Sequence, residues 1–307
     1  MVLSPAASHR VTLAEDNRRV GLMAGWGRYP LVIAEAMTRQ GLQVYCLGVK
    51  QHADPALARY CADFDWIGLG KIGGACRYFV RHGVRQAAVA GKIHKHLLFQ
   101  AGVIYKHLPD WVTIAAFYKH FLLRRRDLRD DTLMHTMLGV FARHGITLWP
   151  PTDFAPELLV KYGQLTRRGP SVPETRDIEF GWQLAKEIGR LDVGQSVAVK
   201  GATALAVEAV EGTDQCIRRA GDLCKQGGFT IVKVAKPQQD MRFDVPTVGL
   251  GTLQTMREAG AVCLAIEADK TIVVDEPDVV RFADRHGIAI VAIRSDGSIP
   301  AGSPATA

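Results

Sequence analysis

Short apolar runs alternate with amphipathic segments through the first half of the chain. Four of these runs are expected to be buried strands, at residues 19–25, 42–49, 64–70 and 86–91. Residues 29–41 and 73–83 lie between strands, have the apolar spacing of helices and end at glycine. Strands and helices in this order form a parallel sheet with right-handed crossovers. The first half is therefore expected to form an α/β domain.

A second α/β series follows a largely helical stretch at 111–144, and residues 163–176, rich in turn formers, are the expected linker. Helices are expected at 179–191, 213–227, 252–260 and 277–287, and strands at 195–200, 204–210, 230–235, 261–268, 271–275 and 288–293. Because single cores usually stop growing at about 250–300 residues, this chain suggests two domains. The expected organisation is a flexible tail at 1–18, domains at 19–160 and 161–296, and a disordered tail at 297–307.

Charge and composition narrow the classes of partner. A net charge of +7 in 307 residues is compatible with three classes of binding partner, namely nucleic acid, an anionic membrane and a phosphorylated substrate. We expect no nucleic-acid partner, because the basic residues are spread out and no polybasic tail or zinc-finger spacing is found. The six cysteines form no CxxC pair and are expected to be reduced thiols of a cytoplasmic protein. No signal-peptide pattern and no membrane-spanning apolar stretch is seen.

Two glycine-bearing turns follow predicted strands. Gly25 and Gly27 lie between the first strand and a helix, where phosphates bind in open α/β sheets. Gly91 and Lys92 follow the fourth strand and are expected to face the same crevice. A dinucleotide is disfavoured, because Pro30 stands where the third glycine of G-x-G-x-x-G belongs and the second strand ends without a ribose-binding acid. A site for a phosphate-bearing nucleotide and a plain tight turn both stay open.

An acidic turn joins a strand to a helix at residues 207–214. Glu208 lies within an apolar strand, and Gly212, Thr213 and Asp214 lead into the helix. A helix N-terminus after glycine can bind an anion, and neighbouring carboxylates can bind a hard cation. A helix capped by Thr213 or Asp214 is the plainer explanation, but it does not account for Glu208.

Two other polar groups have simpler explanations. His94 and His96 are spaced like a metal-binding pair but lack a third ligand, so solvated loop residues are favoured. Asp130 and Asp131 open a helix, where carboxylates cap the chain and complement the dipole. Neither pair is predicted as a site.

The segment KPQQDMRFDVP, residues 236–246, is unusually polar for a stretch that follows a strand. Its side chains of interest are Lys236, Gln239, Asp240, Arg242 and Asp244. In an extended segment the two aspartates and the arginine would share one face, opposite Met241, Phe243 and Val245. Cationic side chains suit phosphate oxygens, and carboxylates suit Mg²⁺ shared with substrate phosphates. A structural surface network is the alternative.

Several motifs resemble those of the LpxI-type UDP-2,3-diacylglucosamine pyrophosphatase family, in that family's order from about residue 19 to residue 294. The most specific are LDVGQ, EGTD and KPQQDMRFDVPTVG, whereas GLMAGWGRYP, AGKIHK and RDDTLM are looser. The resemblance implies an N-terminal Rossmann-like domain and a mixed α/β catalytic domain. It also implies Mg²⁺-dependent cleavage of UDP-2,3-diacylglucosamine to UMP and 2,3-diacylglucosamine 1-phosphate, a step of lipid A biosynthesis.

The resemblance and the residue chemistry together give a set of predicted site residues. The essential aspartate of the family's RFDVPTVG motif is Asp244 here, and the predicted catalytic residues are Asp244, Asp240 and Arg242. The predicted substrate contacts are Gly25, Gly27, Gly91, Lys92, Gly212, Thr213, Lys236 and Gln239. The predicted metal ligands are Asp244, Asp214 and Glu208. Trp26 and Arg129 depart from the family pattern, so the acyl or nucleotide preference is left open.

An acylated substrate implies a cytoplasmic protein that is peripheral on the inner membrane. Residues 110–126 contain aromatic and aliphatic side chains and three arginines, which suit a membrane surface. The same residues would equally suit an ordinary core helix with a basic end. The oligomeric state, a homo-oligomer included, is left open. Two other functions stay open. A nucleotide-dependent oxidoreductase would need a ribose-binding acid, which this sequence lacks. A non-catalytic nucleotide-sugar or lipid-binding protein would have no use for the clustered carboxylates.

Overall fold

The computed structural model describes residues 18–92, 107–122 and 130–300, with the backbone alone for residues 117–122 and 130–133. His94, His96, Arg129 and all but one residue of the expected N-terminal tail lie outside the described residues. Contacts divide the chain into two compact units. Unit 1 contains Met1–Pro156 and Met241–Phe243, and unit 2 contains Glu157–Asp240 and Asp244–Ala307. Both units are α/β, as the sequence predicts.

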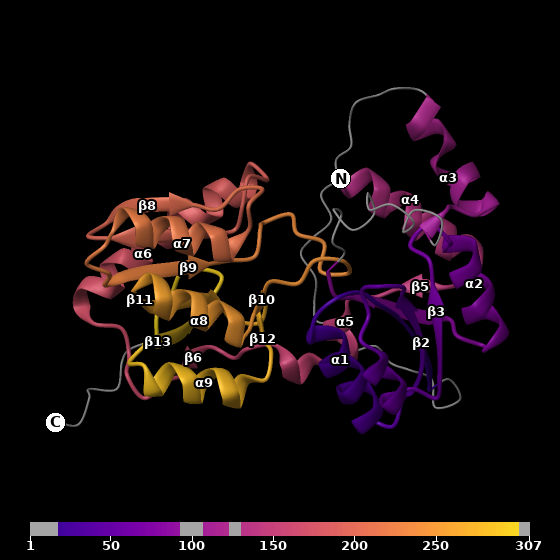
Figure 1. The fold of residues 1–307 in the computed structure, drawn as a ribbon, viewed down its shortest axis with the longest axis horizontal. Coiled ribbons are helices and arrows are strands. Elements are labelled where there is room, and N and C mark those ends of the chain that lie inside the picture. Colours follow the sequence, from indigo (N-terminus) through magenta and orange to yellow (C-terminus); the bar gives the residue numbers. More distant parts are fainter. Residues whose placement is uncertain (1–17, 93–106, 123–129, 301–307) are drawn as a thin grey trace. The chain divides into compact units, whose positions relative to one another are not determined.

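Unit 1 is built on a parallel sheet with the strand order β3-β2-β1-β4-β5 (Figure 1). Its strands are β1 (Arg19–Ala24), β2 (Gln43–Val49), β3 (Asp63–Ile67), β4 (Gln86–Ala90) and β5 (Thr147–Leu148). The strand order reverses beside β1, because β4 pairs with β1 and not with β3. Ligands of open α/β sheets bind at such a switch point, beyond the carboxyl ends of the strands.

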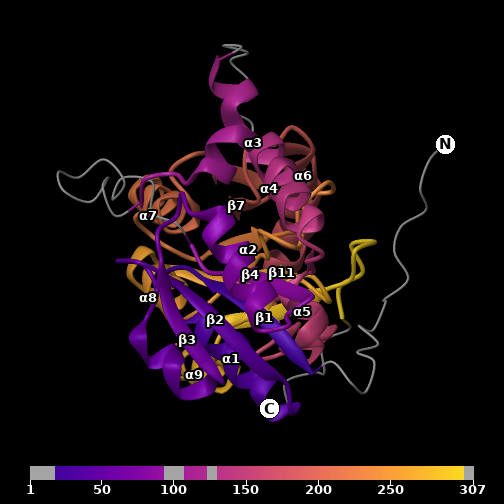
Figure 2. The same cartoon turned by 90° about the vertical axis from the view of Figure 1, so that its right-hand side faces the viewer.

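Helices cover both faces of this sheet, which explains why its central strands are apolar throughout. The helices are α1 (Tyr29–Arg39), α2 (Ile72–Arg81), α3 (Trp111–Leu122), α4 (Asp130–Arg143) and α5 (Pro151–Phe154), with 3₁₀ turns at Pro55–Tyr60 and Pro156–Leu158. Phe79 of α2 and Phe141 of α4 pack with Met23 and Leu47 on one face. Helix α1 lies on the other face, and α3 packs on α2 (Figure 2). No helix in the described part of the chain is long and apolar enough to cross a membrane.

Unit 2 contains a mixed sheet with the order β6-β13-β11-β9-β7-β8. Its strands are β6 (Gly163–Gln164), β7 (Ser196–Lys200), β8 (Thr203–Val207), β9 (Phe229–Lys233), β11 (Ala261–Glu267) and β13 (Ala289–Ile293). Strands β9, β11 and β13 are parallel, while β6, β7 and β8 each run antiparallel to a neighbour. A separate parallel pair joins β10 (Thr247–Val248) to β12 (Ile272–Val273).

Alternate side chains of the unit 2 strands enter two different cores. The covering helices are α6 (Val172–Arg190), α7 (Thr213–Leu223), α8 (Leu250–Ala259) and α9 (Glu276–Arg285). Ile231 and Ile266 pack towards α7, α8 and α9, whereas Val232 and Ala265 pack towards α6. Gly181 lets α6 approach the sheet closely, because a Cβ there would lie 2.7 Å from a methyl of Val232. The sheet is thus buried on both faces.

Residues 163–176 are part of unit 2, so the prediction of a linker there is wrong. Gln164 of β6 pairs with Val291 of β13, and the chain then enters α6 through a capping box made by Ser171 and Glu174. Turn-forming residues are common to flexible linkers and to loops held by buried polar contacts, and composition does not separate the two. Here an arginine holds the loop.

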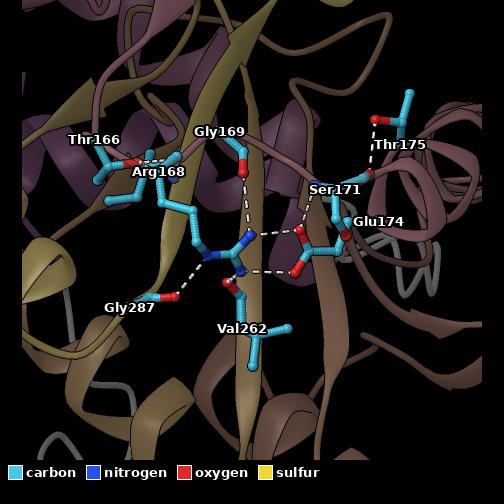
Figure 3. Close-up of polar contacts among 9 residues, drawn as sticks. Thr166, Arg168, Gly169, Ser171, Glu174, Thr175, Val262 and Gly287 are labelled. Carbon is cyan, nitrogen blue, oxygen red and sulfur yellow. Dashed lines mark hydrogen bonds and ion pairs between the residues drawn. The ribbon is translucent and has the colours of Figure 1, made fainter. Parts of the chain in front are cut away.

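The side chain of Arg168 is hydrogen-bonded through every one of its N–H groups (Figure 3). The acceptors are Gly287 O (2.9 Å), Gly169 O (3.1 Å), Val262 O (2.8 Å) and the two carboxylate oxygens of Glu174 (2.7 Å each). We call this group, with Ser171, the Arg168 cluster. Burial raises the pKa of Glu174, but hydrogen bonds from Arg168 and from Ser171 N outweigh burial and hold that pKa below its usual range.

The C-terminal segment is partly packed. Gly297 (φ +88°) lies against the indole of Trp182, and Ile299 packs against the α6 side of the core. Residues 297–300 of the expected disordered tail are therefore fixed to unit 2, and the rest of that tail lies outside the described residues.

Candidate active site

The structure brings the two predicted glycine turns of unit 1 together at the switch point. Gly25 N donates to Ala90 O (2.8 Å), at the ends of β1 and β4. Trp26 and Lys92 then exchange backbone hydrogen bonds of 2.8 and 2.9 Å. Gly25, Gly27, Gly91 and Lys92 thus form one local backbone arrangement that leads into α1. This is the place where an open α/β sheet receives phosphate groups.

Steric contacts explain two of these glycines. A Cβ on Gly25 would lie 2.8 Å from Lys92 O. Gly91 has φ +95°, and a Cβ there would lie 2.7 Å from Pro30 Cγ. Gly27 also has a positive φ, of +109°, but open space surrounds its Cβ position. The side chains of Trp26 and Lys92 are exposed beside this space, so a ligand can approach the backbone there.

Tyr29 is a candidate ligand contact that the sequence reasoning missed. It is the first residue of α1, directly after the glycine turn. Its hydroxyl is buried without a hydrogen-bond partner among the described residues, and burial raises its pKa well above the ordinary value. A tyrosine two residues after the second glycine of the turn is the sequence signal that could have pointed to it.

In unit 2 the acidic turn meets the ends of β7 and β9. Thr213 Oγ1 donates to Glu208 Oε1 (3.0 Å) and lies 3.3 Å from Ser196 Oγ. Lys233 Nζ donates to Thr213 Oγ1 (3.1 Å) and to Thr247 O (3.1 Å). We call Glu208, Thr213, Lys233 and Ser196 the Glu208 cluster. The helix α7 begins at Thr213 with Gly212 (φ +83°) as N-cap and without a side-chain cap, so the predicted capping by Thr213 or Asp214 is wrong.

The Glu208 cluster contains buried charge that is only partly hydrogen-bonded. Glu208 is 6% exposed and Lys233 is 6% exposed. Glu208 Oε2 has no hydrogen-bond partner among the described residues. Leaving a buried charged oxygen unpaired is costly, so this atom is a candidate contact for a water, an ion or a ligand. Lys233 was not predicted; its only signal is a lysine that ends the apolar strand β9.

Residues 236–246 form a series of turns, so the prediction of an extended segment with Asp240, Arg242 and Asp244 on one face is wrong. Gln239 N donates to Lys236 O (3.0 Å), and Asp244 N donates to Asp240 O (3.2 Å). These local hydrogen bonds replace sheet pairing. Arg242 lies over the ring of Phe243, with 5.9 Å from its Cζ to the ring centroid.

The predicted polar residues of this segment are nevertheless linked. Gln239 Oε1 accepts from Lys236 N (2.9 Å), and Gln239 Nε2 donates to Asp244 Oδ2 (2.7 Å). Lys236 Nζ forms a 2.6 Å ion pair with Asp192, in the LDVGQ motif. Gln239 therefore holds the exposed carboxylate of Asp244 in one orientation.

Two buried contacts connect this segment to the sheet. Glu267, at the carboxyl end of β11, accepts from Ala235 N (2.8 Å) and from Lys186 Nζ (2.6 Å). At the other end, Thr247 O accepts from Lys233, and Thr247 Oγ1 donates to Val245 O (2.8 Å). The segment is thus anchored on both sides to the edge of the sheet that carries the Glu208 cluster. Sequence reasoning missed Lys186 and Glu267.

The three predicted metal ligands make separate contacts. Glu208 binds Thr213, Asp214 accepts from Thr252 Oγ1 (3.3 Å), and Asp244 accepts from Gln239. No cluster of three or more His, Cys, Asp or Glu side chains that could hold a metal ion occurs in the described ranges. Mg²⁺, however, is commonly held by one or two carboxylates, waters and substrate phosphates. The unpaired Glu208 Oε2 and the exposed Asp244 carboxylate fit that manner of binding.

The protein has two α/β units. One carries glycine turns at a switch point, and the other carries carboxylates and lysines at a sheet edge. These features define a class of protein suited to a phosphate-bearing ligand. Comparison with known proteins gives the particular family. Residues 19–158 match the LpxI N-terminal domain, and residues 161–291 match the LpxI C-terminal domain. A UDP-2,3-diacylglucosamine pyrophosphatase LpxI from Caulobacter vibrioides is 30% identical over 284 residues, which are 90% of this chain and 98% of that protein. The chain belongs to the LpxI family.

Proposed function

We propose that this protein is a hydrolase that cleaves the pyrophosphate of UDP-2,3-diacylglucosamine to UMP and 2,3-diacylglucosamine 1-phosphate, in lipid A biosynthesis. The observation that carries the proposal is the relationship to the Caulobacter vibrioides pyrophosphatase, which spans 98% of that protein. Both halves of the chain match the family, so the likeness is not confined to one nucleotide-binding unit.

The chemistry of unit 1 supports phosphate or nucleotide binding by Gly25, Gly27, Gly91 and Lys92. Backbone that approaches without side chains, next to the first turn of α1, favours an anion through N–H groups and the helix dipole. Lys92 adds an exposed positive charge. The phenol of Tyr29 offers a further hydrogen bond.

In unit 2, cations and a helix N-terminus surround the carboxylates. Lys236 suits phosphate oxygens, and the N-terminus of α7 at Gly212 and Thr213 favours negative charge. Lys233 lies behind Thr213 as a buried positive charge. Charge fixed in a poorly solvated place stabilises an anionic transition state more than the same charge in water.

Hydrolysis requires a water oxygen to bond to phosphorus while a bridging P–O bond breaks. We assign the water proton to Asp244, whose carboxylate is exposed and oriented by Gln239. Asp240 supports this residue through the backbone bond from Asp244 N. The displaced phosphate oxygen leaves as an anion beside the cationic side chains.

Mg²⁺ is part of the proposal. One or two of the carboxylates Asp244, Glu208 and Asp214 would hold it, together with waters and substrate phosphates. When bound, it would supply positive charge that polarises the phosphoryl group.

The first test measures UMP release from UDP-2,3-diacylglucosamine by the purified protein with Mg²⁺. We expect Asp244→Ala to lower turnover by about 10³-fold or more while substrate binding persists, because a proton acceptor contributes about 10²–10⁴-fold. Asp222→Ala is the matched control, since Asp222 is an exposed carboxylate paired with Lys225. EDTA should abolish the activity and added Mg²⁺ should restore it.

Two results would count against this proposal at different levels. Absence of UMP from the wild-type reaction would remove the hydrolase function. Full activity of Asp244→Ala would leave the function in place but remove Asp244 from the mechanism.

The substrate also suggests a place of action. Two acyl chains hold UDP-2,3-diacylglucosamine in a bilayer, so we propose that the enzyme works from the cytoplasm as a peripheral protein on the inner membrane. The net charge of +7 supports contact with an anionic surface.

A further inference from the structure

Large apolar side chains are exposed at the start of helix α3 and just before it. Trp111 is 81% exposed, Leu108 is 48% exposed and Ile114 is 39% exposed. Trp111 and Ile114 are three residues apart and therefore lie on one side of the helix. Helix α3 projects beyond α2, away from the sheet of unit 1 (Figure 2). Exposed aromatic and aliphatic groups in such a place indicate an interaction surface.

The other side of α3 is fixed to unit 1. Val112 lies against Gly73 of α2, where a Cβ would be 2.7 Å from its side chain. Thr113 Oγ1 accepts from Ile72 N (3.1 Å), and Ala116 packs on the core. The exposed side chains are thus not needed for packing within the unit.

Positive charge borders the apolar group. Lys71, the N-cap of α2, and Arg77 of α2 are exposed; the Lys71 Cβ and the Arg77 Nη2 would lie 3.6 and 3.8 Å from a Cβ on Gly74. Gly74 N donates to Asp110 Oδ2 (2.8 Å), which ties this part of α2 to the start of α3. Asp110 also lies 4.0 Å from Arg77 and offsets part of its charge. Of these three side chains, two are cationic and one is anionic.

We propose that Leu108, Trp111 and Ile114, with Lys71 and Arg77, form a docking surface for an anionic lipid membrane. Tryptophan favours the boundary between acyl chains and headgroups, and lysine and arginine favour anionic headgroups. The choice of a membrane over a protein partner rests on the proposed function, because an acylated substrate places the enzyme at a bilayer. This docking surface would hold unit 1 on the membrane without any spanning segment.

The test is sedimentation of the full chain with vesicles, without substrate. Wild-type protein should bind vesicles of phosphatidylglycerol and phosphatidylethanolamine, and bind phosphatidylcholine vesicles far more weakly. Trp111→Ala/Ile114→Ala should lower the partition coefficient by about 30-fold, because two partly inserted side chains are removed. Lys71→Gln/Arg77→Gln should lower it by about fivefold for each charge, with the loss confined to low salt.

Val172→Ala/Leu223→Ala is the matched control. Both residues are exposed apolar positions of unit 2, at 69% and 67%, and should leave vesicle binding unchanged. Circular dichroism and thermal unfolding check that the α3 variant is folded, as expected for substitutions at exposed positions.

Three results would overturn the docking surface. The first is a wild-type protein that stays in the supernatant, and the second is an α3 variant that sediments like wild type. The third is a wild-type protein that does not bind vesicles and forms a dimer that the α3 substitutions convert to a monomer. That result would make the surface a contact between two copies of the chain. Failure of the proposed function is distinguishable, because a protein that binds vesicles but releases no UMP keeps the docking surface and loses the hydrolase.

Discussion

The Arg168 cluster and the Glu208 cluster are two groups of charged side chains, buried or partly buried, in the same unit, and they differ in how completely they are hydrogen-bonded. Arg168 uses every N–H group, and both carboxylate oxygens of Glu174 accept from it. In the Glu208 cluster, one carboxylate oxygen accepts from Thr213, and the other has no partner within the described part of the chain.

From this difference we predict a structural role for the Arg168 cluster and a binding role for the Glu208 cluster. A saturated network has no donor or acceptor to offer a ligand, and breaking it leaves a buried charge without a partner. In a network with an unpaired oxygen, the folded protein is already destabilised by the desolvation of that oxygen. A ligand that hydrogen-bonds to the oxygen can offset this free energy. Substitutions in the first should therefore change stability, and substitutions in the second should change activity.

The largest expected effect is in the Glu208 cluster. Lys233→Met should lower kcat/KM for UMP release by about 10²–10³-fold, because a preorganised positive charge at the site is lost. The melting temperature should fall as well, because Glu208 then stays buried without this cation, so the loss of kcat/KM is the result that marks a binding role. Steady-state kinetics and thermal unfolding measure the two quantities.

Lys161→Met is the control for this substitution. Lys161 is 71% exposed and pairs with Asp269 at the surface. Its replacement should change neither quantity. If Lys233→Met lost stability but kept its kcat/KM, Lys233 would have a structural role like that of Arg168. The proposed difference between the two clusters would then be wrong.

A smaller effect, on stability alone, is expected in the Arg168 cluster. Arg168→Met should lower the free energy of unfolding of unit 2 by roughly 2–3 kcal/mol, below the value for a fully buried pair because Arg168 is 37% exposed. Urea unfolding measures the change, and kcat should remain near that of wild type in the folded variant.

The neighbouring residue provides a matched control. Arg167 is 93% exposed, and Arg167→Met should change stability by less than about 0.5 kcal/mol. The double variant Arg168→Met/Glu174→Leu should recover part of the loss, because no uncompensated charge remains. A double variant less stable than Arg168→Met would contradict this explanation.

The smallest expected effect is a pH dependence. Because the folded-state pKa of Glu174 is lowered, its stabilising contribution is complete above the unfolded-state pKa and is lost as the pH falls through the folded-state pKa. Wild type should therefore be more stable than Glu174→Gln at about pH 7, and the difference should shrink towards about pH 3. Urea unfolding across this range would show a constant difference if the ion pair were unimportant.

Strands with two buried faces could be predicted from sequence. The expected ranges 42–49, 86–91 and 261–268 nearly coincide with β2, β4 and β11, because helices on both sides of a sheet require continuous apolar runs. Strands β6 and β10, of two residues each, carry too little pattern to be recognised. Their pairing depends on neighbours that are distant in the sequence.

The polar segments were harder to predict, for two physical reasons. Alternating polar and apolar residues at 236–246 fit a strand, but local hydrogen bonds such as Asp244 N to Asp240 O are stronger determinants there. Lys233 was overlooked because the burial of a lysine depends on partners supplied by other elements, here Thr213 and Thr247. The roles of the predicted site residues remain predictions that the substitutions above would test.

The assignment of Met241–Phe243 to unit 1 has a consequence for how this chain can be divided. Phe243 packs on the core of unit 1, although the residues on either side of this short segment belong to unit 2. No single cut therefore yields two complete halves. A fragment that ends at Pro156 would contain the parallel sheet but lack a side chain of its own core, and the complementary fragment would display that phenyl ring without its packing partners.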